Sequence, residues 1–115
     1  MVNSWQEIAK TKQDQRRAAI PSHWILDESI KPGAGVHDIQ DFPTTSGFFT
    51  AEELQITEAT ASEVVANIAD RKWTAVEVVK AVSKRAAVAQ QLVNCLTEIY
   101  FEQALERAEE LDEYQ

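Results

Sequence analysis

The chain has 115 residues and a mass of 12.9 kDa, with 44% hydrophobic and 26% charged residues. These values fit one small globular domain, or part of a larger one, and exclude disorder throughout. Nineteen acidic residues against eleven basic ones give a net charge of −8. This excess of negative charge disfavours nucleic acid and anionic membrane surfaces, so we expect neither as a partner.

Two further features bear on the compartment. The single cysteine, Cys95, excludes a disulfide within the chain. The polar N-terminal stretch has no apolar run typical of a secretory signal, and no stretch approaches the roughly 18 apolar residues of a membrane span. We therefore expect a cytoplasmic protein.

The first predicted element is a helix over about residues 4 to 20. Ser4 and Glu7 have the spacing of a capping box, and Trp5 and Ile8 share one face. The rest of the stretch is nearly all polar, so this helix is expected to lie on a surface. A proline ends it.

A long irregular arm is predicted at about residues 21–50, which hold all three prolines and all three glycines. We expect the arm to wrap a surface, and the rest of the chain offers little surface for it. Its apolar anchors are Trp24, Ile25, Leu26, Phe42, Phe48 and Phe49.

A helical region follows. Thr50 and Glu53 have the capping-box spacing, but the next residues, "LQIT", favour an extended segment. A second helix is predicted over 61–70, with an apolar stripe. Its members are Val64, Val65, Ile68 and Ala69.

Another capping box, Thr74 with Glu77, opens a long helix. Its main apolar stripe has helical spacing and small side chains typical of close packing. The stripe consists of Val79, Val82, Ala86, Ala89 and Val93, and Val78, Ala81 and Val88 widen it.

The chain closes with "LVNCLTEIY", predicted as a short extended link or as a continuation of the long helix, and with one more helix. That helix carries Phe101, Ala104, Leu105, Ala108 and Leu111. The predicted class is mostly α, with residues 1–49 as an N-terminal helix and arm and 50–115 as a helical region.

The segments "DFPTTSGFFTAEELQIT" and "ASEVVANIADRKWTAVEVV" through "ALERAEELD" carry a family resemblance. Together they resemble the N-terminal portion of amidase signature enzymes, and more narrowly the fungal acetamidase and general amidase branch. The matching positions of the family's turn, link and last helix are Thr74, Glu77, Val78, Asn94, Ala104, Ala108 and Asp112, while Ala75 replaces a frequent serine. The opening stretch that leads to "IPSHW" also resembles the fungal branch, and residues 27–40 match least.

The resemblance implies the N-terminal helical region of an α/β fold, without the central sheet, and an enzyme that hydrolyses carbon–nitrogen bonds of small amides. Family members use a lysine base, a bridging serine in a cis peptide and a serine nucleophile. The family places all three after the last helix, beyond Gln115. We therefore carry over no catalytic residue, expect no cofactor, and expect the chain alone to be inactive.

Upstream substitutes are not evident. A lysine base needs burial to lower its pKa, and a serine nucleophile needs oxyanion donors nearby. The available lysines lie in polar or helix-surface contexts and the serines have no glycine-rich context. These are Lys10, Lys12, Lys31, Lys72, Lys80 and Lys84, and Ser4, Ser22, Ser29, Ser46, Ser62 and Ser83.

Several patterns allow two interpretations. His37, Asp38 and Asp41 could form a metal site, but a plain solvated loop is favoured, so no metal is predicted. His23 is interpreted as structural, and Cys95 as a small buried filler rather than a nucleophile. The arm's aromatic residues could line a ligand pocket, although packing onto a larger body is favoured. The acidic "EELDEY" could dock a partner, although the outer face of the last helix is favoured.

Two functions are left open. The chain is either an N-terminal piece of an amidase or a small helical interaction module. In the second case it would bind itself or a full-length amidase through the stripe of the long helix. That stripe consists of Val79, Val82, Ala86, Ala89 and Val93.

Overall fold

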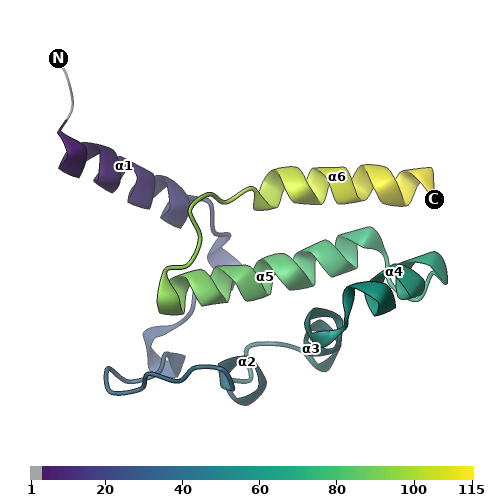
Figure 1. Ribbon diagram of the computed structural model, residues 1–115, viewed down its shortest axis with the longest axis horizontal. Coiled ribbons are helices and arrows are strands. Elements are labelled where there is room, and N and C mark those ends of the chain that lie inside the picture. The colour runs from purple at the N-terminus through teal and green to yellow at the C-terminus, as the bar shows by residue number, and fades with distance from the viewer. Residues whose placement is uncertain (1–3) are drawn as a thin grey trace.

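The computed structural model describes residues 4–115, which form helices and loops and no β-strand (Figure 1). The predicted mostly α class without a central sheet is therefore confirmed for this part of the chain. The elements in chain order are α1 (Trp5–Ala18), η1 (Ser22–Trp24), η2 (Glu28–Ile30), α2 (Phe42–Thr45), α3 (Ala51–Glu58), α4 (Ala61–Ala69), α5 (Ala75–Val93) and α6 (Phe101–Tyr114).

Four of these helices begin with the same local device. In each, a serine or threonine oxygen accepts the N–H three residues on, and the glutamate there accepts the N–H of the capping residue. This arrangement satisfies amides that would otherwise have no intrahelical partner. Three of the boxes were predicted and are confirmed. The pairs are Ser4 with Glu7, Thr50 with Glu53, Thr60 with Glu63, and Thr74 with Glu77.

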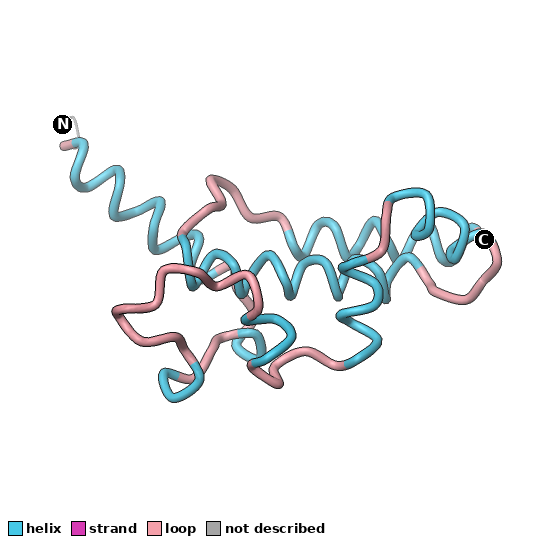
Figure 2. Tube along the Cα trace, turned by 60° about the horizontal axis from the view of Figure 1, so that its bottom comes forward, coloured by secondary structure: helices cyan, strands magenta, loops and turns pink. Residues whose placement is uncertain are grey.

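α5 is the centre of the fold. α6 returns antiparallel beside it, while α3 crosses on another side (Figures 1 and 2). The side chains of α5 that are buried most deeply are Ala81, Ala87 and Val88, and Ala87 is 0% exposed. Small side chains at these positions let neighbouring segments approach the helix axis closely.

The buried face of α5 differs from the main stripe expected from the sequence. Val82 and Val93 are 50% and 53% exposed, whereas Ala81 and Val88, which were expected only to widen the stripe, are buried. The reason is tertiary: the arm packs on Val88, η1 packs on Ala87, and Trp73 packs on Ala81. The helical period was correct, but the direction of burial depended on these distant segments.

The arm of residues 21–50 is irregular between three short helical turns, η1, η2 and α2. Leu26, Phe42 and Phe49 are buried in one cluster with Val88. The expectation that the chain itself offers the arm little surface is therefore wrong, because α5 supplies that surface. Ile25, one of the predicted anchors, is 44% exposed.

Two local predictions are corrected or resolved by the packing. The "LQIT" segment is helical rather than extended, because α3 buries Ile56 against Trp73 and packs Leu54 against the arm. At the other end of α5, helix continues through Val93 and then stops, so the remainder of "LVNCLTEIY" is a loop.

The molecule is open. Its radius of gyration is 16.5 Å and its extents are 53 × 39 × 23 Å, whereas a compact domain of this length has a radius of about 13 Å. Much of the difference lies in α1, which projects from the body, buries none of its residues and leaves Trp5 74% exposed (Figure 1). No helix within residues 4–115 combines the length and the apolar character that a membrane span requires.

Candidate functional site

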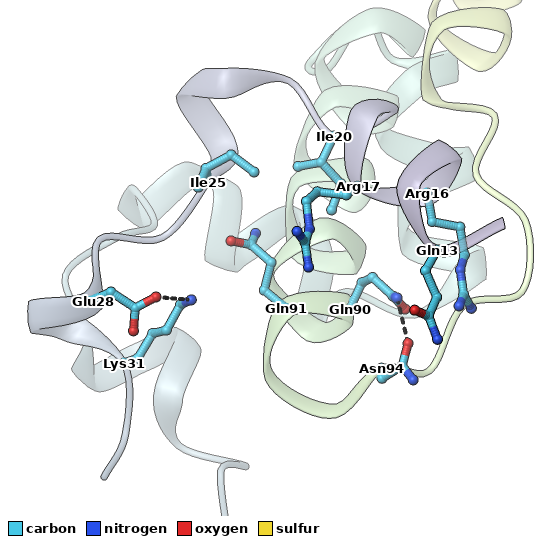
Figure 3. A pocket seen from close by; sticks show the side chains of 10 residues that line it. All are labelled: Gln13, Arg16, Arg17, Ile20, Ile25, Glu28, Lys31, Gln90, Gln91 and Asn94. Atoms are coloured by element: carbon cyan, nitrogen blue, oxygen red, sulfur yellow. Dashed lines mark hydrogen bonds and ion pairs between the residues drawn. The ribbon is translucent and has the colours of Figure 1, made fainter. Parts of the chain in front are cut away.

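A cavity of about 590 Å³ lies where three segments meet: the C-terminal half of α1, the η1–η2 part of the arm and the C-terminal end of α5 (Figure 3). It is partly open to solvent. Its lining residues are polar or charged except for two, Ile20 after α1 and Ile25 in the arm. The lining residues are Gln13, Arg16, Arg17, Ile20, Ile25, Glu28, Lys31, Gln90, Gln91 and Asn94.

Gln91 holds the arm wall of this cavity in place. Its Nε2 donates to Trp24 O at 2.8 Å and to Ala87 O at 3.1 Å, and its Oε1 accepts from Leu26 N at 2.8 Å. The Gln91 side chain thus provides hydrogen-bond partners for the backbone groups on both sides of Ile25. Because these groups are partly buried, leaving them unpaired would be costly.

Gln90 and Asn94 shape the end of α5. Gln90 Nε2 donates to Asn94 Oδ1 at 2.8 Å, and Gln90 Oε1 accepts from Leu96 N at 2.6 Å. Asn94 has a left-handed backbone with φ of 49°, a conformation that asparagine tolerates better than most residues. This turn ends the helix and sends the chain back toward α6.

The α1 wall is attached through that same turn. Arg16 Nη1 donates to Leu96 O at 2.7 Å, while its buried Nε has no hydrogen-bond partner. Lys12 pairs with Glu98, and the hydrogen bond from Lys12 holds the pKa of the Glu98 carboxyl below its usual range. These contacts fix the C-terminal half of α1 and leave its N-terminal half projecting.

The chemistry available in the cavity is limited. Its lining contains no serine, threonine, cysteine, histidine or aspartate, and its one carboxylate, on Glu28, pairs with Lys31 at 2.8 Å. A hydrolase of the activated-nucleophile type needs a hydroxyl or thiol within reach of a base. The cavity can therefore present positive charge and amide groups, but no such nucleophile.

Comparison with known proteins finds fungal relatives over nearly the whole chain. The chain is 57% identical over 111 residues to an amidase of Curvularia clavata, a match that covers 96% of this chain and 21% of that protein. It is 41% identical over 114 residues to an acetamidase of Emericella nidulans, covering 99% of this chain and 20% of the relative. No protein-family model matches.

The fold agrees. A solved structure of a fatty acid amide hydrolase superposes with a TM-score of 0.84 at 27% identity, over 97% of this chain and 20% of that one. The chain therefore matches the N-terminal part of fungal amidases and acetamidases. It spans about a fifth of the length of the amidases that it matches.

Asp112, one of the residues that carried the resemblance, has a structural role in this chain. Asp112 of α6 reaches the start of α5, where its Oδ1 accepts from Ala75 N at 2.7 Å and its Oδ2 from Val76 N at 3.0 Å. A carboxylate at a helix N-terminus satisfies free amides and complements the helix dipole. Asp112 therefore ties the far ends of the α5–α6 hairpin together.

The other candidate residues are separated from the cavity. His37, Asp38 and Asp41 lie exposed between η2 and α2, and Asp38 accepts a hydrogen bond from Gln40 N. Within residues 4–115 no group of three or more His, Cys, Asp or Glu side chains is placed to hold a metal. His23 stacks at a tilt beside Trp24, with ring centroids 5.2 Å apart.

Cys95 is exposed, so the expected burial of its thiol is wrong. Asn94 ends α5 with a left-handed turn, and Cys95 follows in the loop that leads to α6. That the chain holds no catalytic, cofactor or metal-binding residue stays a prediction.

Lys84 was missed by the sequence analysis, which placed it with the surface lysines. Its side chain is 13% exposed, and its Nζ donates to Phe48 O at 2.8 Å and to Glu53 Oε1 at 2.9 Å. The ammonium also lies 4.7 Å and 5.1 Å from the ring centroids of Phe48 and Phe49. The available signal was helical spacing, since Lys84 shares the face of Ala81 and Val88.

Proposed function

We propose that the chain forms the N-terminal, non-catalytic part of an amide-hydrolysing enzyme that acts on carbon–nitrogen bonds of small amides. The observation that carries this proposal is the match to fungal amidases over nearly the whole chain, at up to 57% identity. The small-amide substrate is suggested by the acetamidase relative. A cytoplasmic location remains a prediction from the sequence.

The surface area supports a role inside a larger body. The chain exposes 8240 Å², whereas a compact monomer of 12.9 kDa exposes roughly 6,300 Å². The excess is larger than the roughly 800 Å² that one partner buries in a standard protein interface. An α5-centred scaffold with this much open surface is suited to packing against further protein.

A first experiment tests the chain alone. Purified chain is incubated with acetamide and with an aromatic amide, and released ammonia is measured. We expect no turnover above buffer, because the cavity described above offers no nucleophile. Turnover that co-purifies with the chain and is abolished by a serine-directed inhibitor would contradict the proposal.

A second experiment tests whether the chain can do the work of an amidase N-terminus. The matching fifth of the Emericella nidulans acetamidase is replaced by this chain, and acetamide hydrolysis is measured. We expect activity to be kept. A matched chimaera with Trp24→Ala controls for the fold, because that change should loosen the arm. A soluble, folded chimaera without activity would contradict the proposed equivalence.

One observation favours a second candidate function, a helical interaction module. Val82 and Val93, two members of the predicted α5 stripe, are half exposed. Self-association through Val79, Val82, Ala86, Ala89 and Val93, or binding of a full-length amidase, would cover them. Light scattering after size-exclusion chromatography separates the two: a dimer that Val82→Glu converts to monomer supports this candidate, and a monomer with cooperative melting removes self-association.

A further inference from the structure

The cavity between α1, the arm and α5 concentrates positive charge in an acidic molecule. Of the eleven basic residues in the chain, Arg16, Arg17 and Lys31 line this one cavity, against the single carboxylate of Glu28. Three positive charges and one negative charge leave a local charge of +2 in a chain of net charge −8. We propose that this cavity is a binding site for a small polyvalent oxyanion, such as a di- or tricarboxylate or phosphate.

The first support is the state of the basic groups. Arg17 is exposed, and among residues 4–115 its guanidinium forms no hydrogen bond or ion pair. In the view of the cavity it lies between the Gln90 and Gln91 side chains (Figure 3). Arg16 is less available, because its Nη1 donates to Leu96 O and its unpaired Nε is buried. A guanidinium with free donors is suited to bidentate pairing with a carboxylate or phosphate.

The second support is the ease with which Lys31 becomes available. Its partner Glu28 has a side chain that is 87% exposed, so their ion pair is close to a surface pair and contributes little stability. Glu28 can turn toward water while Lys31 Nζ meets an anion in the cavity. Lys31 and Arg17 come from opposite walls, so a ligand with several negative charges would contact both walls (Figure 3).

The third support is that the walls are held in place before any ligand arrives. The amide groups of Gln90 and Gln91 are already used to hold the loop and the arm, so the cavity does not need to form on binding. A preformed site loses less conformational freedom on binding. The volume of about 590 Å³ lies within the range of small-molecule sites.

The negative net charge of the chain limits the places where an anion can bind favourably. Nineteen acidic residues repel anions at long range, but at physiological salt charges beyond about 8 Å are largely screened. The three basic side chains of the lining therefore dominate the interaction once the anion is inside. We expect binding to weaken as chloride is raised.

Citrate is the probe. Isotope-labelled chain is titrated with citrate at constant ionic strength, while backbone and side-chain NMR signals are followed. We expect a saturable shift at Arg17, Gln90, Gln91 and Asn94, and phosphate should compete with it. Shifts that grow linearly without saturation, or that fall equally on Arg107, the one basic residue of α6, would overturn the proposal.

Variants sharpen the test. Arg17→Gln should weaken citrate binding about tenfold, a change of about 1.4 kcal/mol. Lys31→Gln provides a second variant in the arm, should Arg17→Gln alter folding in circular dichroism melts. Arg107→Gln is the control, because it removes one positive charge from an exposed pair on α6. If Arg107→Gln weakened citrate binding equally, the effect would be one of overall charge, and the proposed site would be refuted.

This inference does not rest on the amidase proposal. Loss of citrate binding in the Arg17→Gln chain leaves the acetamidase chimaera experiment untouched. Likewise, an inactive chimaera says nothing about the NMR titration.

Discussion

α1 and α5 begin with the same capping box, but their surroundings differ. Ser4 with Glu7 starts α1 and Thr74 with Glu77 starts α5, through the same pair of reciprocal hydrogen bonds. α5 then buries four residues among the arm, α3 and α6, whereas α1 buries none. A local signal thus decides where a helix starts, while its stability in the fold depends on contacts from distant segments.

Two tryptophans give the largest test of this difference. Trp24 is buried against Ala87 and meets the Phe101 ring edge-on at 5.7 Å, whereas Trp5 on α1 is exposed. We expect Trp24→Ala to lower the free energy of unfolding by about 3–5 kcal/mol, and Trp5→Ala by less than about 0.5 kcal/mol. Urea unfolding followed by circular dichroism measures both. Similar losses for the two variants would remove the contrast between α1 and the α5 core.

Lys84 is the next test, because it joins the end of the arm to α5 and to the start of α3. Lys84→Met should cost about 2 kcal/mol, since it leaves Phe48 O and part of Glu53 without a donor in a partly buried place. Lys80→Met, one turn earlier and exposed, is the matched control and should change stability by less than about 0.5 kcal/mol. The same urea experiment applies, and a neutral Lys84→Met would mean that the arm is held by its apolar residues alone.

Asp112 tests the cap that α6 provides to α5. Asp112→Ala should cost about 1–2 kcal/mol, because the amides of Ala75 and Val76 lose their acceptors. Hydrogen exchange should speed up at those two amides, while Glu109→Ala on the exposed side of α6 leaves them unchanged. Unaltered protection in Asp112→Ala would show that water replaces the carboxylate without loss.

The smallest expected effect is a pH dependence at Glu53. Burial raises the pKa of this carboxyl, but the hydrogen bond from Thr50 N and the nearby Lys84 ammonium outweigh burial, so the pKa lies below its ordinary value of 4.5. A lowered carboxyl pKa adds stability that is present above the ordinary value and is lost as pH falls through the folded value. Glu53→Gln should therefore lose less stability than the unaltered chain between pH 7 and pH 3. Parallel losses would contradict this.

How much of the fold the sequence could predict depended on how far apart in the chain the interacting residues lie. The capping boxes and the helical periods of α5 and α6 involve residues three or four apart, and they were found. The helical state of "LQIT" was missed, because it depends on Ile56 meeting Trp73 and Ala81. The packing of the arm against Val88 and the burial of Lys84 were missed for the same reason.

The cavity could not be predicted from sequence patterns at all. Its walls are joined by a hydrogen bond between residues 65 positions apart, Leu26 and Gln91. Nothing in the local spacing of glutamine, arginine or lysine separates such a wall from an ordinary polar surface. The family resemblance, by contrast, rested on the order of many short motifs, and it was confirmed over nearly the whole chain.

The Asp112 contact makes the length of the α5–α6 hairpin a matter of register. Each residue of an α-helix advances the chain by about 1.5 Å and turns it by about 100°. One residue inserted between Phe101 and Asp112 would therefore swing the carboxylate away from the first turn of α5. Insertions in the loop before Phe101 leave the rotational position of Asp112 relative to Phe101 on α6 unchanged. Among natural variants of this hairpin, length changes are thus expected in the loop and not within α6.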